Sequence, residues 1–317
     1  MPLAYSTLGC PGDSLDQVIA TAKTAGATGL ELRLAAGEFV SAGMGPAQSA
    51  AVAERLAVAG LTVLAVAAYV RVCAPAVNPG SAAVPNDGTD AAGGRGAGDP
   101  VLAELVSAIE LTARLSAGNV GAAAQLRVFP GAGLEPCGSG QEVSADMAAA
   151  DLRGAHRLNM VADLARERGV TILLETHDSH PRAADVRRIL EHVDAAAPVQ
   201  VIWDLMHPWR YGEEPERTAK LLARSLAYPQ FKDGVKNPRD HSVTLTLPGQ
   251  GELPLARMLE LTSRIAATKG IGDPWVSLEW ERAWHPELPP VAEALDAFKA
   301  VLALPRAVSM AGDTNDQ

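Results

Sequence analysis

The 317-residue sequence predicts an α/β protein built as one (β/α)8 TIM barrel, a single domain. Two observations predict it. Short apolar runs alternate with helix-like segments along the whole chain, eight of each. In the second half the apolar runs also end in oxygen-bearing side chains, at Glu175, Asp204, Gln230 and Glu279. Such groups are costly to bury alone, and the carboxyl ends of barrel strands are where this fold builds its active sites.

The expected strands begin at Leu3, Gly29, Leu61, Leu126, Val170, Val199, Leu226 and Trp275. The expected helices cover residues 14–25, 46–59, 100–117, 144–168, 182–193, 214–224, 255–268 and 290–302. Ser14 followed by Gln17 is typical of a capping box that opens the first helix. We therefore expect a barrel over residues 1–306 and a flexible tail over 307–317.

Two connections are longer than is usual in compact domains, at 74–99 and 233–252. Both follow expected strands, so they belong to the face where barrel active sites lie. The first is rich in Gly, Ala, Pro and Asn, which fits either a lid or a linker. Composition leaves these two alternatives open.

Composition excludes several partners. The net charge of −10 and the lack of a basic run argue against a nucleic-acid surface. The sequence shows neither an apolar stretch of membrane length nor a signal peptide. Three widely spaced cysteines fit a reducing cytoplasm, where we expect the protein to be located. A homo-oligomer and a small partner subunit both remain open.

The four strand-end oxygens predict a metal site. Residues two apart on a strand share a face, so Glu175, Gln230 and Glu279 lie on the same inward faces as Leu173, Tyr228 and Ser277. Asp204 faces inward with Ile202. Three carboxylates and one amide are hard oxygen donors, which predict one divalent cation, Mn²⁺ or Mg²⁺.

The same alternation places His177, Lys232 and Glu281 at the barrel mouth. Lys232 either pairs with Glu281 or donates to a substrate oxygen, and its protonated amine has no lone pair for a metal. Arg127 lies inside a strand and needs a partner there, so it either neutralises the carboxylates or binds an anionic substrate group. His177 is a further candidate for substrate contact.

Several short segments, in this order and spacing, resemble the xylose isomerase-like TIM-barrel superfamily of sugar isomerases and epimerases. They are Tyr5-Ser6-Thr7-Leu8-Gly9, Gly26-Ala27-Thr28-Gly29-Leu30-Glu31-Leu32, Leu174-Glu175-Thr176-His177, Trp203-Asp204-Leu205-Met206-His207-Pro208, Gln230-Phe231-Lys232-Asp233, Gly249-Gln250-Gly251-Glu252 and Ser277-Leu278-Glu279-Trp280. The resemblance implies that Glu175, Asp204, Gln230 and Glu279 hold one divalent cation. It also implies that His207 and Lys232 contact the substrate. The third ligand is most often His in ketohexose epimerases, whereas hydroxypyruvate isomerase-like members are similar to this chain in having Gln.

The expected function is a divalent-metal-dependent isomerase or epimerase of a small keto or hydroxy sugar, so the expected partner is a small-molecule sugar or polyol. Glu175 and Glu279 would exchange a carbon-bound proton through a metal-stabilised enediolate. The alternative is a lyase of the same family, a dehydratase or 3-oxo-glycoside cleaving enzyme, in which β-elimination follows the same proton abstraction. An endonuclease IV-like nuclease is disfavoured by the negative charge and by only seven histidines. A non-catalytic sugar-binding barrel is the remaining alternative.

Overall fold

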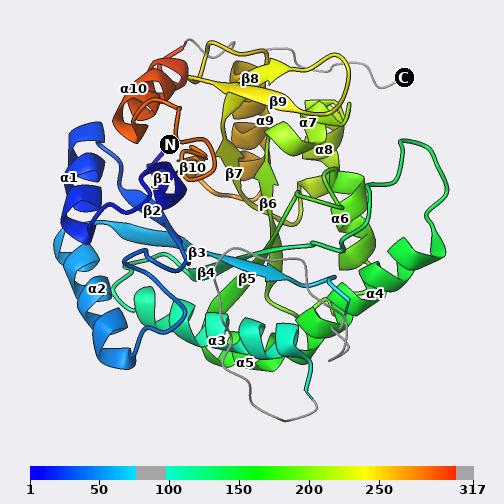
Figure 1. Ribbon diagram of the computed structural model, residues 1–317, viewed down its shortest axis with the longest axis horizontal. Coiled ribbons are helices and arrows are strands. Elements are labelled where there is room, and N and C mark those ends of the chain that lie inside the picture. The colour runs from blue at the N-terminus through cyan, green and yellow to red at the C-terminus, as the bar shows by residue number, and fades with distance from the viewer. Residues whose placement is uncertain (76–97, 305–317) are drawn as a thin grey trace.

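The computed structural model describes residues 1–75 and 98–304. Eight parallel strands close into a barrel in the order β1-β10-β7-β6-β5-β4-β3-β2, and helices surround it (Figure 1). The predicted fold is therefore confirmed. The barrel strands are β1 (Leu3–Ser6), β2 (Gly29–Arg33), β3 (Thr62–Arg71), β4 (Ala124–Phe129), β5 (Val170–Glu175), β6 (Val199–Asp204), β7 (Leu226–Phe231) and β10 (Val276–Leu278).

The helices follow the strands in the expected alternation. They are α1 (Leu15–Ala25), α2 (Pro46–Val58), α3 (Pro100–Leu115), α4 (Ala145–Met160), α5 (Ala162–Glu167), α6 (Ala183–Leu190), α7 (Met206–Arg210), α8 (Pro215–Leu222), α9 (Leu255–Thr268) and α10 (Val291–Leu302). A 3-10 turn, η1 (Thr7–Gly9), follows β1. Ser14 and Gln17 form the predicted capping box at the start of α1.

Two expectations about elements were wrong. The single helix expected over 144–168 is interrupted at Val161, which has φ −102° and ψ 1° and separates α4 from α5. The 233–252 connection is not an irregular loop, because β8 (Asp233–Lys236) and β9 (Val243–Thr246) pair there as an antiparallel hairpin. β-branched residues in β9 favour this strand. The hairpin is at the top of the view in Figure 1, and Lys236 of β8 donates a hydrogen bond to the Trp209 carbonyl of α7 (2.9 Å).

Most of the 74–99 connection and the expected tail at 307–317 lie outside the described residues. Within 1–75 and 98–304, none of the helices combines the length and the apolar character needed to cross a membrane.

Strand alternation divides the core into layers. Outward-facing side chains such as Leu174, Val201 and Trp203 pack in the large apolar cluster between the strands and the helices. Leu173, Ile202 and Tyr228 instead face into the barrel and form a small apolar layer there. Because residues two further along share their face, the polar side chains at the strand ends lie in the layer above.

The segment after β8 and β9 is fixed to the end of β7 by one carboxylate. Asp233 Oδ1 accepts hydrogen bonds from the backbone amides of Gly234 (2.8 Å) and Leu253 (3.2 Å). Its Oδ2 accepts from those of Gly249 (2.8 Å) and Gly251 (3.0 Å). Gly251 must be glycine, since a Cβ there would lie 2.2 Å from Asp233 Oδ1. The segment 249–253 is thus held through its backbone.

Candidate metal and active site

The predicted metal-binding side chains converge at the mouth of the barrel. Glu175 and Asp204 end β5 and β6, Gln230 lies near the end of β7, and Glu279 follows β10. All four are buried. Carboxylate oxygens of Glu175, Asp204 and Glu279 lie within 4.8 Å of one another. We call these three residues the carboxylate cluster.

Gln230 joins the carboxylate cluster through its amide. Its Nε2 lies 3.3 Å from Glu279 Oε1, while its Oε1 is buried and has no hydrogen-bond partner. A buried amide oxygen without a partner is unfavourable unless something binds it. A hard divalent cation among the carboxylates would supply that partner. The donor set therefore fits the predicted cation.

Two buried cationic side chains partly balance the cluster. Lys232 Nζ lies 2.7 Å from Asp204 Oδ2 and 2.5 Å from Glu279 Oε2, and it also contacts Glu281 Oε1. Burial alone would lower the pKa of Lys232, but the three carboxylates raise that pKa well above its usual value. The pairing of Lys232 with Glu281, one of the two predicted alternatives, is therefore present. Substrate contact by Lys232 stays a prediction.

Arg127 lies on the opposite side of the cluster. Its Nε is 3.2 Å from Glu175 Oε2, and its guanidinium packs over the Phe129 ring, 4.0 Å from the centroid. Arg127 is buried, so the partner that the sequence required is Glu175. Binding of an anionic substrate group by Arg127 stays a prediction.

Glu175 is the carboxylate with the most perturbed titration. Burial raises its pKa well above the usual value, Arg127 lowers it, and Glu279 and Asp204 raise it further. A carboxylate of raised pKa takes up a proton more readily near neutral pH. Glu175 thus suits proton exchange with a substrate carbon.

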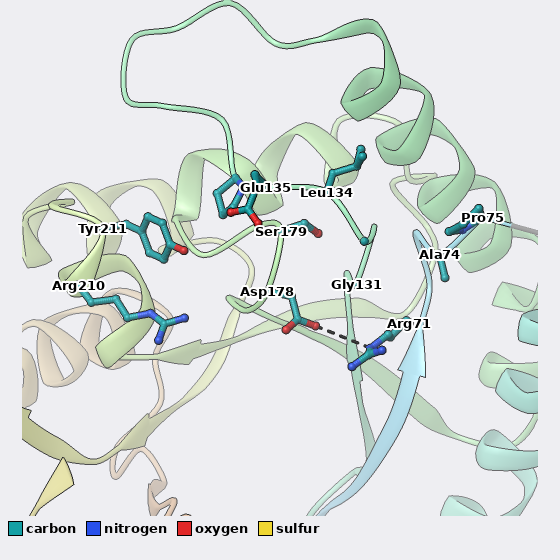
Figure 2. Close-up of a pocket in the computed structure, with 12 residues that line it drawn as sticks. Arg71, Ala74, Pro75, Gly131, Leu134, Glu135, Asp178, Ser179, Arg210 and Tyr211 are labelled. Atoms are coloured by element: carbon teal, nitrogen blue, oxygen red, sulfur yellow. Dashed lines mark ion pairs between the residues drawn. The ribbon is translucent and has the colours of Figure 1, made fainter. Parts of the chain in front are cut away.

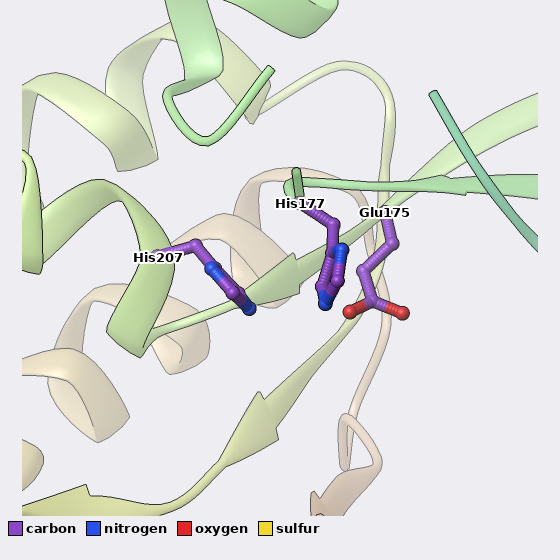
Figure 3. Close-up of side chains that lie close together, drawn as sticks. All are labelled: Glu175, His177 and His207. Carbon is purple, nitrogen blue, oxygen red and sulfur yellow. The ribbon is translucent and has the colours of Figure 1, made fainter. Parts of the chain in front are cut away.

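Two histidines lie close to Glu175: His177 is next to it, and His207 lies on the far side of His177 (Figure 3). The rings of His177 and His207 are 4.3 Å apart between centroids, and one ligand atom from each lies within 4.8 Å of a Glu175 oxygen and of the other. His177 Nδ1 is 2.8 Å from Asp178 Oδ1, which leaves Nε2 available. Neither ring nitrogen of the buried His207 has a hydrogen-bond partner, although Nε2 lies 3.5 Å from Asp204 Oδ2. Glu175 therefore belongs both to the carboxylate cluster and to a second group that it forms with His177 and His207.

The pKa of His207 is lowered well below its usual value, first by burial and then by His177, Arg210 and Lys232. His207 is consequently neutral at pH 7. A neutral imidazole can donate one hydrogen bond and accept another, which fits the predicted contact with a substrate oxygen.

A cavity of about 530 Å³ opens next to these histidines (Figure 2). Asp178 links the two regions, since it lines the cavity and contacts His177. Arg71 and Arg210 lie on opposite sides of the space, and Tyr211 lies beside Arg210 (Figure 2). The cavity is large enough for a small sugar.

A network of hydrogen bonds fixes the turn that carries Asp178. His177 and His180 pair across it through their backbones, and Asp178 has φ 48°. His180 Nε2 lies 2.6 Å from Asp151 Oδ1, and His180 Nδ1 lies 2.9 Å from Ser179 Oγ. Arg188 completes this buried network with a 2.8 Å contact to Asp151 Oδ2. The network anchors a turn whose backbone is strained at Asp178.

The sequence analysis assigned no role to Glu31, which the structure places among the site residues. Glu31 is on β2 and fully buried. Burial and Glu279 raise its pKa to about 7, although hydrogen bonds from Ser277 and Tyr228 oppose the shift. The sequence does contain a signal for this residue, because Glu31 is a charged residue between Leu30 and Leu32 in an apolar strand. Such a buried charge needs partners.

Comparison with solved structures agrees with the fold. The IOLI protein with a bound zinc atom is 17% identical with a TM-score of 0.66, over 95% of this chain and 96% of that one. D-psicose 3-epimerase in the presence of D-fructose is 13% identical with a TM-score of 0.65, over 96% and 97%. The probable 3-DHS dehydratase AsbF of Bacillus anthracis is 15% identical with a TM-score of 0.63, over 96% and 99%.

No curated protein sequence matches the chain. The sequence profile of the xylose isomerase-like TIM barrels, however, matches residues 19–301, which is most of the sequence. Together with the closed barrel and the carboxylates at its mouth, this match identifies the chain as a member of the xylose isomerase-like TIM-barrel family.

Proposed function

We propose that this protein is a divalent-metal-dependent isomerase or epimerase of a small keto or hydroxy sugar. The observation that carries the proposal is the convergence of Glu175, Asp204 and Glu279 at the barrel mouth, next to Gln230, whose buried Oε1 has no hydrogen-bond partner. Oxygen donors alone favour Mn²⁺ or Mg²⁺. The similar structures include an epimerase and a probable dehydratase, which supports the reaction class.

Glu175, Asp204, Gln230 and Glu279 would hold the cation, which would supply the positive charge that acidifies a substrate C–H bond next to a carbonyl. Glu175 and Glu279 would exchange the proton, one removing it from the carbon and the other returning it to the substrate. Neutral His207 would donate to the carbonyl oxygen as negative charge develops there.

A lyase is the second candidate, and one observation favours it. Elimination begins with the same loss of a carbon-bound proton, but a β-hydroxyl then leaves and needs a proton of its own. His177 lies beside the cavity with Nδ1 2.8 Å from Asp178 Oδ1, so a protonated His177 would have its Nε2–H free to donate to that hydroxyl.

The proposal is tested by loading the protein with Mn²⁺, measuring the bound metal and incubating it with keto sugars in D₂O. We expect about one bound cation per chain and deuterium incorporation at the exchanged carbon, followed by NMR. An isomerase yields an epimer or isomer, whereas a lyase yields an unsaturated product. Failure to bind any metal, or bound metal without exchange on any substrate, would overturn the proposal.

Glutamine variants of Glu175 and Glu279 test whether each of these residues exchanges the proton. We expect Glu175→Gln and Glu279→Gln each to lower turnover by at least about 10²-fold, because the amide keeps a ligand oxygen but cannot take up the proton. At least one of them should still bind Mn²⁺. The control is Glu191→Gln, an exposed residue at the end of α6, which should not change turnover. Near wild-type rates in either site variant would remove that glutamate from the acid–base pair.

A further inference from the structure

We infer that Glu31 is a positioning residue that fixes the orientation of the Gln230 amide: it holds Nε2, so that Oε1 is the end left available to a cation. The inference rests on the metal site in the proposed function. It concerns a residue on β2, which β1 and β10 separate from β7 in the barrel order. Glu31 itself is not among the residues whose oxygens form the cluster.

Three donors converge on Glu31. Gln230 Nε2 donates to its Oε2 at 2.8 Å, and the Tyr228 hydroxyl donates to the same oxygen at 2.9 Å. The Ser277 hydroxyl donates to Oε1. When Glu31 is ionised, its carboxylate only accepts hydrogen bonds, so each of these groups then presents a hydrogen to it.

An amide side chain has two unlike ends. With Nε2 toward Glu31, Gln230 also donates its second hydrogen toward Glu279 Oε1 at 3.3 Å. Its Oε1 is then buried without a partner and available to a cation. The reversed amide would place an acceptor against the Glu31 carboxylate and point N–H groups at the cation. Glu31 therefore decides whether Gln230 can act as a ligand.

The hydrogen bond between Glu31 and Gln230 explains how a glutamine can act as a metal ligand although only its oxygen, and not its nitrogen, can bind a cation. Residues that hold metal ligands in place commonly change metal affinity by 10–100-fold when they are altered. Because Glu31 and Gln230 are both fully buried, water does not compete for their hydrogen bond. The pair is thus a matched unit in which each residue type requires the other.

The test measures Mn²⁺ affinity by equilibrium dialysis and follows thermal unfolding in parallel. We expect Glu31→Gln to weaken binding by about 10–100-fold, because a glutamine there both donates and accepts and no longer selects one orientation. The matched control is Tyr228→Phe, which removes another hydrogen bond to the same Glu31 oxygen but leaves the contact with Gln230. This control should bind Mn²⁺ as the wild type does.

The double variant Glu31→Gln/Gln230→Glu separates positioning from general destabilisation. A carboxylate at 230 presents an oxygen in either orientation, and a glutamine at 31 can donate to it. We therefore expect the double variant to recover most of the affinity lost in Glu31→Gln. Wild-type affinity in Glu31→Gln, equal losses in Tyr228→Phe, or no recovery in the double variant would each overturn the inference. If the wild type binds no Mn²⁺, the proposed function fails instead.

Discussion

Lys232 and Arg127 divide the buried carboxylates of the mouth between them. Lys232 contacts Asp204, Glu279 and Glu281, whereas Arg127 contacts Glu175. A buried carboxylate without a counter-charge would take up a proton and lose its value as a hard ligand. The two cations therefore help to keep the ligands ionised. Lys232 and Arg127 are fewer than the carboxylates that they contact. This imbalance favours the binding of a further positive charge at the site.

His207 gives a prediction at the scale of one residue. We expect His207→Ala to lower kcat/KM by about 10²-fold, because the neutral imidazole donates to charge that develops on the substrate. Metal content should not change. Steady-state kinetics and metal analysis measure the two effects, with the half-exposed His285→Ala as control. Loss of the metal in His207→Ala would place this histidine among the ligands.

Single residues also mark the limit of sequence analysis. Strand alternation was sufficient to bring Glu175, Asp204, Gln230 and Glu279 together, because parity is a local property of an extended chain. It could not reveal the partner of Glu31. The contact between Glu31 and Gln230 spans 199 positions, and no local pattern encodes it.

At the scale of elements, the turn between β5 and α6 depends on α4. Asp151 on α4 binds both His180 in the turn and Arg188 on α6. Burial alone would raise the pKa of Asp151, but hydrogen bonds from His180 and Arg188 outweigh it and hold that pKa below its usual value. One carboxylate therefore ties a helix to the loop that carries His177 and Asp178.

This connection predicts a pH-dependent loss of stability. Asp151→Asn should lower the free energy of unfolding by about 1–3 kcal/mol at pH 7. A carboxyl whose pKa is lowered by folding stabilises the protein above its unfolded pKa of about 4, and this contribution disappears as pH falls through the folded pKa. The gap between wild type and variant should therefore shrink on acidification.

Urea unfolding at a series of pH values measures this gap. The control is Asp163→Asn, since Asp163 also pairs with an arginine but is exposed on α5. Its effect should be small at every pH. The explanation would be wrong if Asp151→Asn were as stable as the wild type at pH 7, or if the gap widened in acid.

Element boundaries were predicted less well than element order. Val161 interrupts the helix expected over 144–168. The sequence between Asn159 and Ala162 contains neither a glycine nor a proline that would predict this interruption. The β8–β9 hairpin was missed because each of its strands has only four residues, too few for a clear alternation. Both features are set by packing against the finished barrel.

For the molecule as a whole, the closed barrel shields two of its thiols. Cys10 and Cys73 are buried, and burial raises the pKa of each to about 12, assisted by Asp13 and Asp151 respectively. Cys137 is only partly buried. Since the thiolate is the reactive form, Cys10 and Cys73 should resist alkylation while the barrel is intact.

We expect iodoacetamide at pH 8 to modify Cys137 in the folded protein, and all three cysteines in urea. Mass spectrometry of digested protein identifies the modified sites. The protection of Cys73 should be lost together with the fold, because its Sγ lies against Gly154 of α4 in the packed core. Rapid modification of Cys73 in native buffer would contradict this account.

The whole-molecule architecture was the most predictable feature. Eight repeats of strand and helix leave few arrangements that bury both faces of each strand, and the closed parallel barrel is one of them. The direction and spacing of the strand ends follow from that closure. The course of the connections does not, because it depends on individual contacts such as those of Asp233.

The hydrogen bonds to Asp233 have a consequence for which substitutions this protein can accept during evolution. Asp233 holds the segment 249–253 through the backbone amides of Gly249, Gly251 and Leu253, so the path of that segment does not depend on most of its side chains. A substitution at the exposed Gln250 can therefore change the surface that this segment presents while its course stays the same. One carboxylate and one glycine, Gly251, carry the constraint. Selection is free to act on exposed side chains such as that of Gln250.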